Sequence, residues 1–302
     1  MLNIEIVEVG PRDGLQNENV LFNTAQKLDL INRAVAAGVR RIEAASFVHP
    51  KLVPQMADAE AIAAGLDRNN GAVYIGLVLN KRGALRALEA GMDEIGAVCT
   101  ASDSFGRRNQ SQSAEESLAM CKDVVALAKQ EGKRAQITIA TAFGCPFEGE
   151  VDPNKVFAIA RSAAESGPFE IALADTIGAA SPGEVAALVE RVRKEIAPLP
   201  VRVHFHNTRN TGLANVWAAV NAGAQTVDAS IGGIGGCPFA PRATGNVPTE
   251  DVVYMLERSG WTTNLKLPGL LDASRWLTEQ MGRELPGMVA RAGMFPKTAG
   301  EA

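Results

Sequence analysis

The sequence predicts an α/β protein in which eight strands alternate with helices, and the pattern favours a closed (β/α)8 barrel. Eight short apolar runs are separated by helix-like segments, and several of these segments end on a small residue followed by glycine. No Pro-, Gly- or Ser-rich linker and no change of composition divides the 302 residues. A doubly wound sheet uses the same local signals, so this arrangement stays open on the pattern alone.

The expected strands are short and apolar, and the segment after each one is long enough for a parallel crossover. In chain order they are Ile4–Val9, Arg41–Ala44, Val73–Leu79, Glu94–Val98, Gln136–Ala140, Glu170–Ala174, Val201–Phe205 and Thr226–Ser230. Glycine adopts the left-handed conformation that closes a helix. Such helix ends are expected at Ala37-Gly38, Ala90-Gly91, Ser166-Gly167 and Ala222-Gly223.

Two helix-like segments follow the eighth strand. Thr249–Arg258 is expected to form the last barrel helix, and Leu270–Met281 an added C-terminal helix. Residues 1–302 are therefore expected to form one domain, with the barrel over about 1–258 and a C-terminal helical extension over 259–302. The final residues of this extension are expected to fray.

The composition is typical of a globular protein with a sizeable core, with 46% hydrophobic and 21% charged residues. A net charge of −4 gives no basic field, so neither nucleic acid nor an anionic membrane is expected as a partner. There is no apolar run of transmembrane length, and the N-terminus has the pattern of a strand, not of a targeting peptide. The four cysteines are far apart and form no CxxC pair, so no disulfide is expected and the cytoplasm is the expected compartment.

Polar residues gather at the C-terminal strand ends, where the catalytic side chains of (β/α)8 barrels lie. They occur in Gly10–Glu18, at Glu43, at Asp175-Thr176, in His204-Phe205-His206, and at Asn246 after a glycine-rich loop. His204 and His206 are two residues apart on a strand and therefore point to the same face. With Asp13 and the amide oxygen of Asn246 they predict a divalent metal site, and the oxygen ligands favour Mg²⁺ or Mn²⁺ over Zn²⁺. The alternative is that the two histidines are ordinary strand residues.

Three further residues are candidates for catalysis. Arg12 puts a permanent cation beside Asp13, suited to holding an enolate oxygen, and a structural ion pair is the alternative. Glu43 could orient Arg12 or be a structural carboxylate. Cys237 in the glycine-rich loop could present its thiol to a substrate or be a buried apolar residue. This loop lacks both the G-x-G-x-x-G pattern and the P-loop Lys-Ser/Thr, so no nucleotide site is expected there.

Several longer motifs occur along most of the chain, from the first strand to about Met255. They are Val9–Glu18, Ser46-Phe47-Val48, Phe143–Gly149, Asp175–Gly178, Gly235–Pro238, Gly245-Asn246 and Thr249–Asp251. These motifs resemble the 3-hydroxy-3-methylglutaryl-CoA lyase family, whose members are metallolyases on a TIM barrel with an Arg-Asp pair after the first strand. The resemblance implies the closed barrel and a retro-Claisen cleavage of a 3-hydroxyacyl-CoA substrate. For the parent substrate the products are acetyl-CoA and acetoacetate.

The resemblance also implies roles for individual residues. The metal ligands would be Asp13, His204, His206 and Asn246. Arg12 would stabilise the enolate, Glu43 and Asp175 would be further active-site acids, and Cys237 or His204 would protonate the enolate carbon. The residues expected to contact substrate are Arg12, Gln16, Asn80, Arg209 and Arg242. The oligomeric state is left open, with a homodimer as one assembly.

The chain departs from the family pattern in two loops. Residues 207–211 read Asn-Thr-Arg-Asn-Thr where the family usually has Asp-Thr-Tyr-Gly-Gln, and Arg242 stands where a small residue is common. Arg209 and Arg242 could bind a bulkier or more anionic acyl group or the CoA phosphates, or could be solvated loop residues. The same chemistry on a branched isoprenoid-catabolic substrate or on citramalyl-CoA therefore stays open. A related condensing enzyme or aldolase and a non-catalytic barrel are the remaining alternatives.

Overall fold

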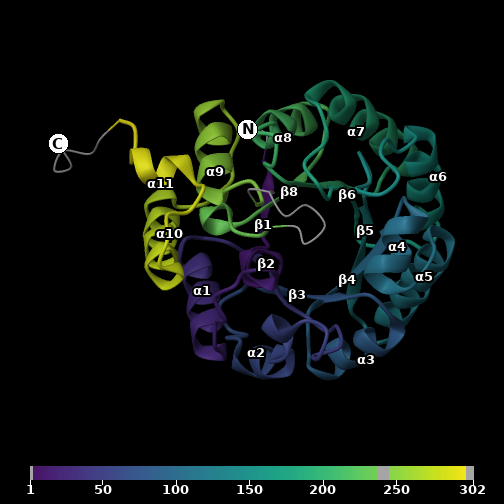
Figure 1. The fold of residues 1–302 in the computed structure, drawn as a ribbon, viewed down its shortest axis with the longest axis horizontal. Coiled ribbons are helices and arrows are strands. Elements are labelled where there is room, and N and C mark those ends of the chain that lie inside the picture. Colours follow the sequence, from purple (N-terminus) through teal and green to yellow (C-terminus); the bar gives the residue numbers. More distant parts are fainter. Residues whose placement is uncertain (1–2, 237–244, 297–302) are drawn as a thin grey trace.

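The computed structural model describes residues 3–236 and 245–296. Its eight parallel strands form one closed barrel in chain order (Figure 1). They are β1 (Glu5–Glu8), β2 (Arg41–Ser46), β3 (Val73–Val78), β4 (Glu94–Thr100), β5 (Arg134–Ala140), β6 (Ile171–Asp175), β7 (Val201–Phe205) and β8 (Thr226–Ala229). β1 pairs with both β2 and β8, with Ile6 beside Val227. The predicted barrel is therefore confirmed, and the doubly wound sheet is excluded.

The helices lie around the barrel, and those from α1 to α8 connect its strands (Figure 1). They are α1 (Thr24–Ala36), α2 (Ala59–Gly65), α3 (Lys81–Glu89), α4 (Asp103–Gln110), α5 (Ala114–Gln130), α6 (Pro153–Ala164), α7 (Pro182–Ile196), α8 (Gly212–Asn221), α9 (Thr249–Arg258), α10 (Leu267–Met281) and α11 (Met288–Ala292). Capping boxes at Asn23 and Ser113 start α1 and α5. The four predicted glycine helix ends all have positive φ, between 63° and 105°.

α10 and α11 lie outside the ring of barrel helices (Figure 1). α9 has the predicted bounds, whereas α10 begins three residues earlier than predicted. Pro268 falls in the first turn of α10, where its missing N–H costs no bond within the helix. α10 packs beside α1 and α9 (Figure 1), and the rings of Phe22 and Trp276 meet edge to face at 6.3 Å. The assignment of all residues to one domain stays a prediction.

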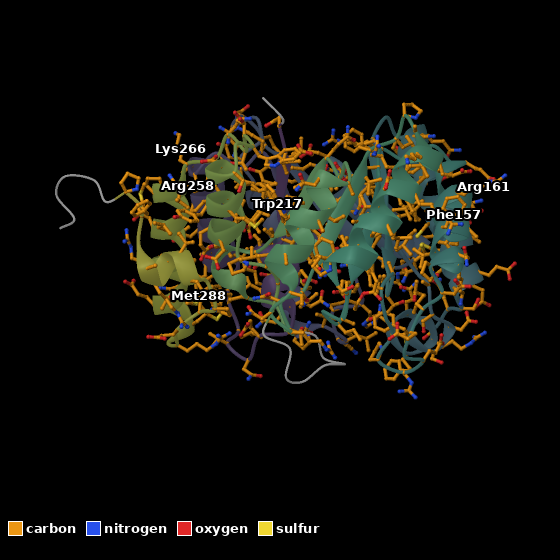
Figure 2. The ribbon with its side chains drawn as sticks, turned by 90° about the horizontal axis from the view of Figure 1, so that it is seen from above. Phe157, Arg161, Trp217, Arg258, Lys266 and Met288 are labelled. Carbon is orange, nitrogen blue, oxygen red and sulfur yellow. The ribbon has the colours of Figure 1, made fainter. Side chains whose placement is uncertain are left out.

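Charged side chains cover the outside of the molecule. Arg161 on α6 lies at the outer edge in Figure 2, and its side chain is 67% exposed. Arg258 and Met288 lie near the opposite edge, on α9 and α11. None of the helices in the described ranges is long and apolar enough to cross a membrane. Several polar residues singled out by the sequence, among them Asp13, Asp175 and His204, lie instead near the C-terminal ends of the barrel strands.

Candidate active site and metal centre

A cavity of about 240 Å³ opens at the C-terminal end of the barrel. One side is polar and comes mostly from β2, β7, β8 and the segment that follows β1. Its residues include Arg12, Asp13, Gln16, Glu43, Arg202, His204, His206 and Asp228. The other side is apolar and comes mostly from β3, β4, β5 and the loop after β2. Its residues include Leu52, Val53, Leu77, Leu79, Val98, Phe105 and Ala140. The cavity thus combines ionisable groups with space for an apolar part of a ligand.

A π-helical turn, η1 (Gly10–Gly14), positions Arg12 and Asp13 after β1. The backbone N–H groups of residues 12, 13 and 14 all donate to the carbonyl of Val9. Gly14 is needed for packing, because a Cβ there would lie 2.7 Å from Cγ1 of Ile234. Such turns occur frequently at functional sites because they redirect side chains within a rigid backbone. Here the turn directs both Arg12 and Asp13 into the cavity.

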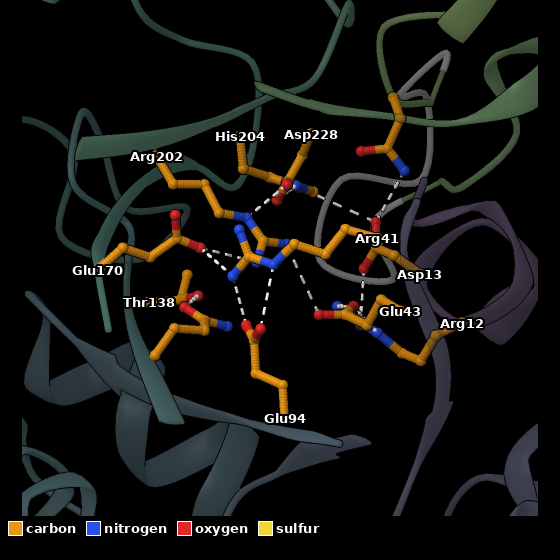
Figure 3. A network of polar contacts seen from close by, with 12 residues as sticks. Arg12, Asp13, Arg41, Glu43, Glu94, Thr138, Glu170, Arg202, His204 and Asp228 are labelled. Atoms are coloured by element: carbon orange, nitrogen blue, oxygen red, sulfur yellow. Dashed lines mark hydrogen bonds and ion pairs between the residues drawn. The ribbon is translucent and has the colours of Figure 1, made fainter. Parts of the chain in front are cut away.

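Arg12 is fixed between two carboxylates (Figure 3). Its Nη1 lies 2.8 Å from Oδ1 of Asp13, and its Nε donates to Oε1 of Glu43 at 2.5 Å. Glu43 lies on β2 and is 2% exposed, so the guanidinium is held from the barrel interior. The side chain of Arg12 is 11% exposed and lines the cavity. A permanent cation is therefore held rigidly beside Asp13, with part of its surface open to a ligand.

Asp13, His204 and His206 form a compact set of metal-binding atoms. The two Nε2 atoms of the histidines are 3.2 Å apart, and Oδ2 of Asp13 lies 3.9 Å from Nε2 of His204. One ligand atom from each residue lies within 4.8 Å of the others. Atoms held about 2.1 Å from one ion at a right angle lie roughly 3 Å apart, so these spacings fit a single divalent ion.

Asn246 adds an oxygen to this set. Its Nδ2 donates to Oδ2 of Asp13 at 2.7 Å and to the carbonyl of Ile234 at 3.2 Å. Its Oδ1 is buried and has no hydrogen-bond partner among the described residues, and the same holds for Nδ1 of His206. Buried polar atoms are normally paired, so an unpaired oxygen beside Asp13 fits a place for a cation. A Cβ at Gly235 would lie 2.4 Å from Nδ2 of Asn246, which explains glycine with φ of 117° there.

The electrostatics also suit a cation. Burial alone would raise the pKa of Asp13, but Arg12 and the two histidines hold it below its usual value. Burial, followed by the neighbouring His204, lowers the pKa of His206 to about 4. Burial also opposes a charged His204, yet Asp228 and Asp13 raise its pKa. An ionised carboxylate and a neutral imidazole are the forms that bind metal ions.

Comparisons with known proteins identify the family of this chain. Residues 3–277 match the model of the HMGL-like family. The chain belongs to this family. Hydroxymethylglutaryl-CoA lyase YngG of Bacillus subtilis is 43% identical over 94% of this chain and 95% of the relative. (R)-Citramalyl-CoA lyase of Chloroflexus aurantiacus is 43% identical over 97% of this chain and 96% of the relative.

The fold matches solved members of the HMGL-like family as well. An HMG-CoA lyase from Acinetobacter baumannii, in complex with coenzyme A and 3-methylmalate, superposes with a TM-score of 0.93. It is 41% identical, and the match covers 98% of this chain and 97% of that one. The family resemblance inferred from the motifs is therefore confirmed. The predicted metal binding is supported as far as a candidate Asp-His-His site, without the identity of the ion.

The other predicted residues of this HMGL-like chain are spread over different environments. Gln16 lines the cavity, and its buried Oε1 has no partner among the described residues. Asn80 is exposed and caps α3 by accepting from the N–H of Gly83. Arg209 donates to the carbonyls of residues 177 and 178. Asp175 is fully buried, accepts from the N–H groups of residues 179 and 180, and has a pKa raised by burial. Cys237 and Arg242 lie outside the described residues.

Sequence reasoning missed two residues of the HMGL-like site, Arg202 and Asp228. Both line the cavity, and Asp228 Oδ2 lies 3.1 Å from Nδ1 of His204. Arg202 lies two residues before His204, so the same alternation that paired the histidines could have placed it on their face. Asp228 lies within the predicted eighth strand. It is the one charged residue of that predicted strand, and this charge was the available signal.

Proposed function

We propose that this chain is a metal-dependent carbon–carbon lyase that cleaves a 3-hydroxyacyl-CoA thioester, with 3-hydroxy-3-methylglutaryl-CoA as the leading substrate. The observation that carries the proposal is the placement of Arg12, held by Asp13 and Glu43, beside the Asp13-His204-His206 set in one cavity. A fixed cation next to a metal site suits a reaction that develops negative charge on a substrate oxygen. The names of two similar relatives support the same class of reaction.

The proposed ligands are Asp13, His204, His206 and Asn246. Two of the four would bind through oxygen, and this favours Mg²⁺ or Mn²⁺ over Zn²⁺. Bound there, a divalent ion would polarise the 3-hydroxyl and lower its pKa. The unpaired Oδ1 of Asn246 and the 3.2 Å spacing of the histidine Nε2 atoms support this ligand set.

The reaction needs one bond broken and two protons moved. The 3-hydroxyl loses its proton, its oxygen becomes a ketone oxygen, and the electrons of the C2–C3 bond pass to the thioester as an enolate. Arg12 is placed to stabilise the enolate oxygen, and Glu43 holds Arg12 in position. A proton delivered to C2 by Cys237 or His204 then gives acetyl-CoA, while the other product is acetoacetate. Cys237 and Asp175 as catalytic groups stay predictions from the family resemblance.

The apolar side of the cavity indicates which groups of a substrate could bind there. Leu77, Val98, Phe105 and Ala140 form a buried cluster that faces the cavity opposite the polar side. This surface can receive the methyl group of 3-hydroxy-3-methylglutaryl-CoA, the methyl group of citramalyl-CoA, or a longer branched substituent. Citramalyl-CoA is the second candidate, because a relative of that name is as similar to this chain as the methylglutaryl-CoA lyase. The proposal includes contacts to the substrate from Gln16, Asn80, Arg209 and Arg242. It also includes a homodimer and a cytoplasmic location.

A small substrate panel tests the proposal. The protein is stripped of metal with a chelator, left without metal or reconstituted with Mg²⁺ or Mn²⁺, and given 3-hydroxy-3-methylglutaryl-CoA, citramalyl-CoA and a 3-hydroxyglutaryl-CoA with a longer 3-alkyl group. We expect acetyl-CoA release to be fastest from 3-hydroxy-3-methylglutaryl-CoA and to require added metal. Faster release from another thioester would replace the leading substrate. Release from none of the three would overturn the proposed lyase.

A further inference from the structure

We propose that Asp228 and Arg202 are positioning residues that fix the orientation and tautomer of His204 and so set the metal affinity of the site. This inference rests on the metal site of the proposed function. It concerns groups behind the ligand set, which neither the motifs nor the names of the relatives assign. The three side chains lie together in Figure 3, with Arg202 and His204 projecting from β7 and Asp228 from β8.

The contact between Asp228 and His204 comes from the register of two strands. Val203 on β7 pairs with Val227 on β8, so the next residues along, His204 and Asp228, lie side by side. Oδ2 of Asp228 is 3.1 Å from Nδ1 of His204. An aspartate that already accepts from an arginine is an acceptor for the imidazole too, so Nδ1 carries the hydrogen. The lone pair of His204 is then on Nε2, the atom that faces His206 and Asp13.

Arg202 holds Asp228 in place from below. Its Nε donates to Oδ1 of Asp228 at 2.5 Å, and the arginine is 1% exposed. The two oxygens of Asp228 therefore have separate partners, Arg202 and His204, and the carboxylate cannot rotate without losing one of them. A histidine ligand held in this way by a carboxylate has a defined ring orientation and a more basic ligand nitrogen.

Arg202 also connects the carboxylate that contacts His204 with the carboxylate that holds Arg12. Its Nη2 lies 3.9 Å from Oε2 of Glu43, the carboxylate that holds Arg12. Its Nη1 lies 3.5 Å from Oε1 of Glu170, which in turn contacts Arg41 deeper in the barrel. The buried guanidinium of Arg202 is thus close to two carboxylates. One is Asp228, which contacts His204, and the other is Glu43, which holds Arg12. Loss of Arg202 would leave buried carboxylates without their counter-charge.

The test is a Mn²⁺ titration of the apoprotein, with thermal unfolding of the same samples as a separate readout. Asp228→Asn keeps the size of the side chain but removes the charge and allows an N–H to face Nδ1. We expect the Kd for Mn²⁺ to rise by about 10- to 100-fold, with folding retained. Arg202→Lys, which keeps the charge but loses the Nε donor, is expected to weaken Mn²⁺ binding by a smaller factor. Arg134→Gln is the matched control, because Arg134 pairs with Glu94 of the interior network and not with Asp228, so this variant should leave the Kd unchanged.

The outcomes separate this inference from the proposed function. An Asp228→Asn variant that binds Mn²⁺ with the wild-type Kd would overturn the positioning role alone. If Asp228→Asn does not fold, Arg202→Lys decides, and an unchanged Kd in that variant overturns the inference. A Kd that rises equally in Arg134→Gln would also overturn it, because the effect would then be a general one on the barrel. Wild-type protein that binds no Mn²⁺ would overturn the metal site of the proposed function, and the inference with it.

Discussion

Glu8→Gln should remove a large part of the pH dependence of stability. Glu8 ends β1 and is fully buried beneath the turn that carries Arg12. Its Oε1 accepts from the N–H groups of Gly10 and Ile231 at 2.8 and 2.9 Å, and its Oε2 accepts from the hydroxyl of Thr249 at 2.7 Å. Burial nevertheless raises its pKa to about 8, well above the usual 4.5.

The raised pKa fixes the sign and the size of the effect. Between about pH 4.5 and 8 the folded protein keeps a proton on Glu8 that the unfolded chain releases. The contribution of the protonated group is therefore fully present below about pH 4.5, and it is lost as the pH rises to about 8. Each unit of pKa shift corresponds to about 1.4 kcal/mol, so the free energy of unfolding should fall by roughly 4 to 5 kcal/mol across this window.

Glutamine imitates the protonated carboxyl at every pH. Its amide oxygen can accept from the two backbone N–H groups, and its NH2 can donate to Thr249. Urea denaturation at pH 5, 6, 7 and 8 should therefore show Glu8→Gln close to wild type at pH 5 and several kcal/mol more stable at pH 8. The exposed Glu131→Gln is the control and should follow wild type throughout. A difference between Glu8→Gln and wild type that does not change with pH would refute the reasoning.

Three further predictions concern the site. His206→Ala should weaken Mn²⁺ binding by more than about 100-fold and abolish turnover, because loss of a metal ligand reduces affinity more than loss of the group that supports a ligand. Exposed His49→Ala is the control. Calorimetry that finds Mn²⁺ bound normally to His206→Ala would falsify the ligand assignment. Arg12→Lys should lower kcat by roughly 100-fold or more, because lysine cannot hold Glu43 and an enolate oxygen with one planar group; steady-state kinetics with an unchanged kcat would contradict this. Cys237→Ser should keep the metal and slow turnover by roughly 100-fold, and full turnover would exclude a role for the thiol in proton transfer.

The barrel and much of its polar rim could be predicted because they depend on local patterns. Strand and helix periods repeat along the chain, and the spacing of His204 and His206 alone places them on one face. Their proximity to Asp13 follows from the closed barrel, because β1 and β7 end at the same rim. Asn246 could be proposed as a ligand from its place after the eighth strand and from the family motif, but its contact with Asp13 depends on the loop after β8.

The missed features depend on contacts between distant strands. Arg41, Glu94, Glu170 and Arg202 fill the barrel interior as a buried ion network, although charged residues on strands are usually expected to face solvent. Asp228 contacts His204 because of the register between β7 and β8. This register cannot be read from the local pattern of a single sequence. Similarly, the sequence does not distinguish an asparagine that caps a helix, as Asn80 does, from an asparagine that binds a ligand.

Acetyl-CoA release from 3-hydroxy-3-methylglutaryl-CoA tests the central claim most directly. The protein is treated with a chelator, divided, and assayed with and without added Mn²⁺, with both products quantified by mass spectrometry. A lyase built on the Asp13-His204-His206 set should release acetyl-CoA and acetoacetate in equal amounts, and only in the sample with metal. Equal release in both samples would contradict a metal-dependent reaction, and an intact thioester in both would contradict the lyase itself.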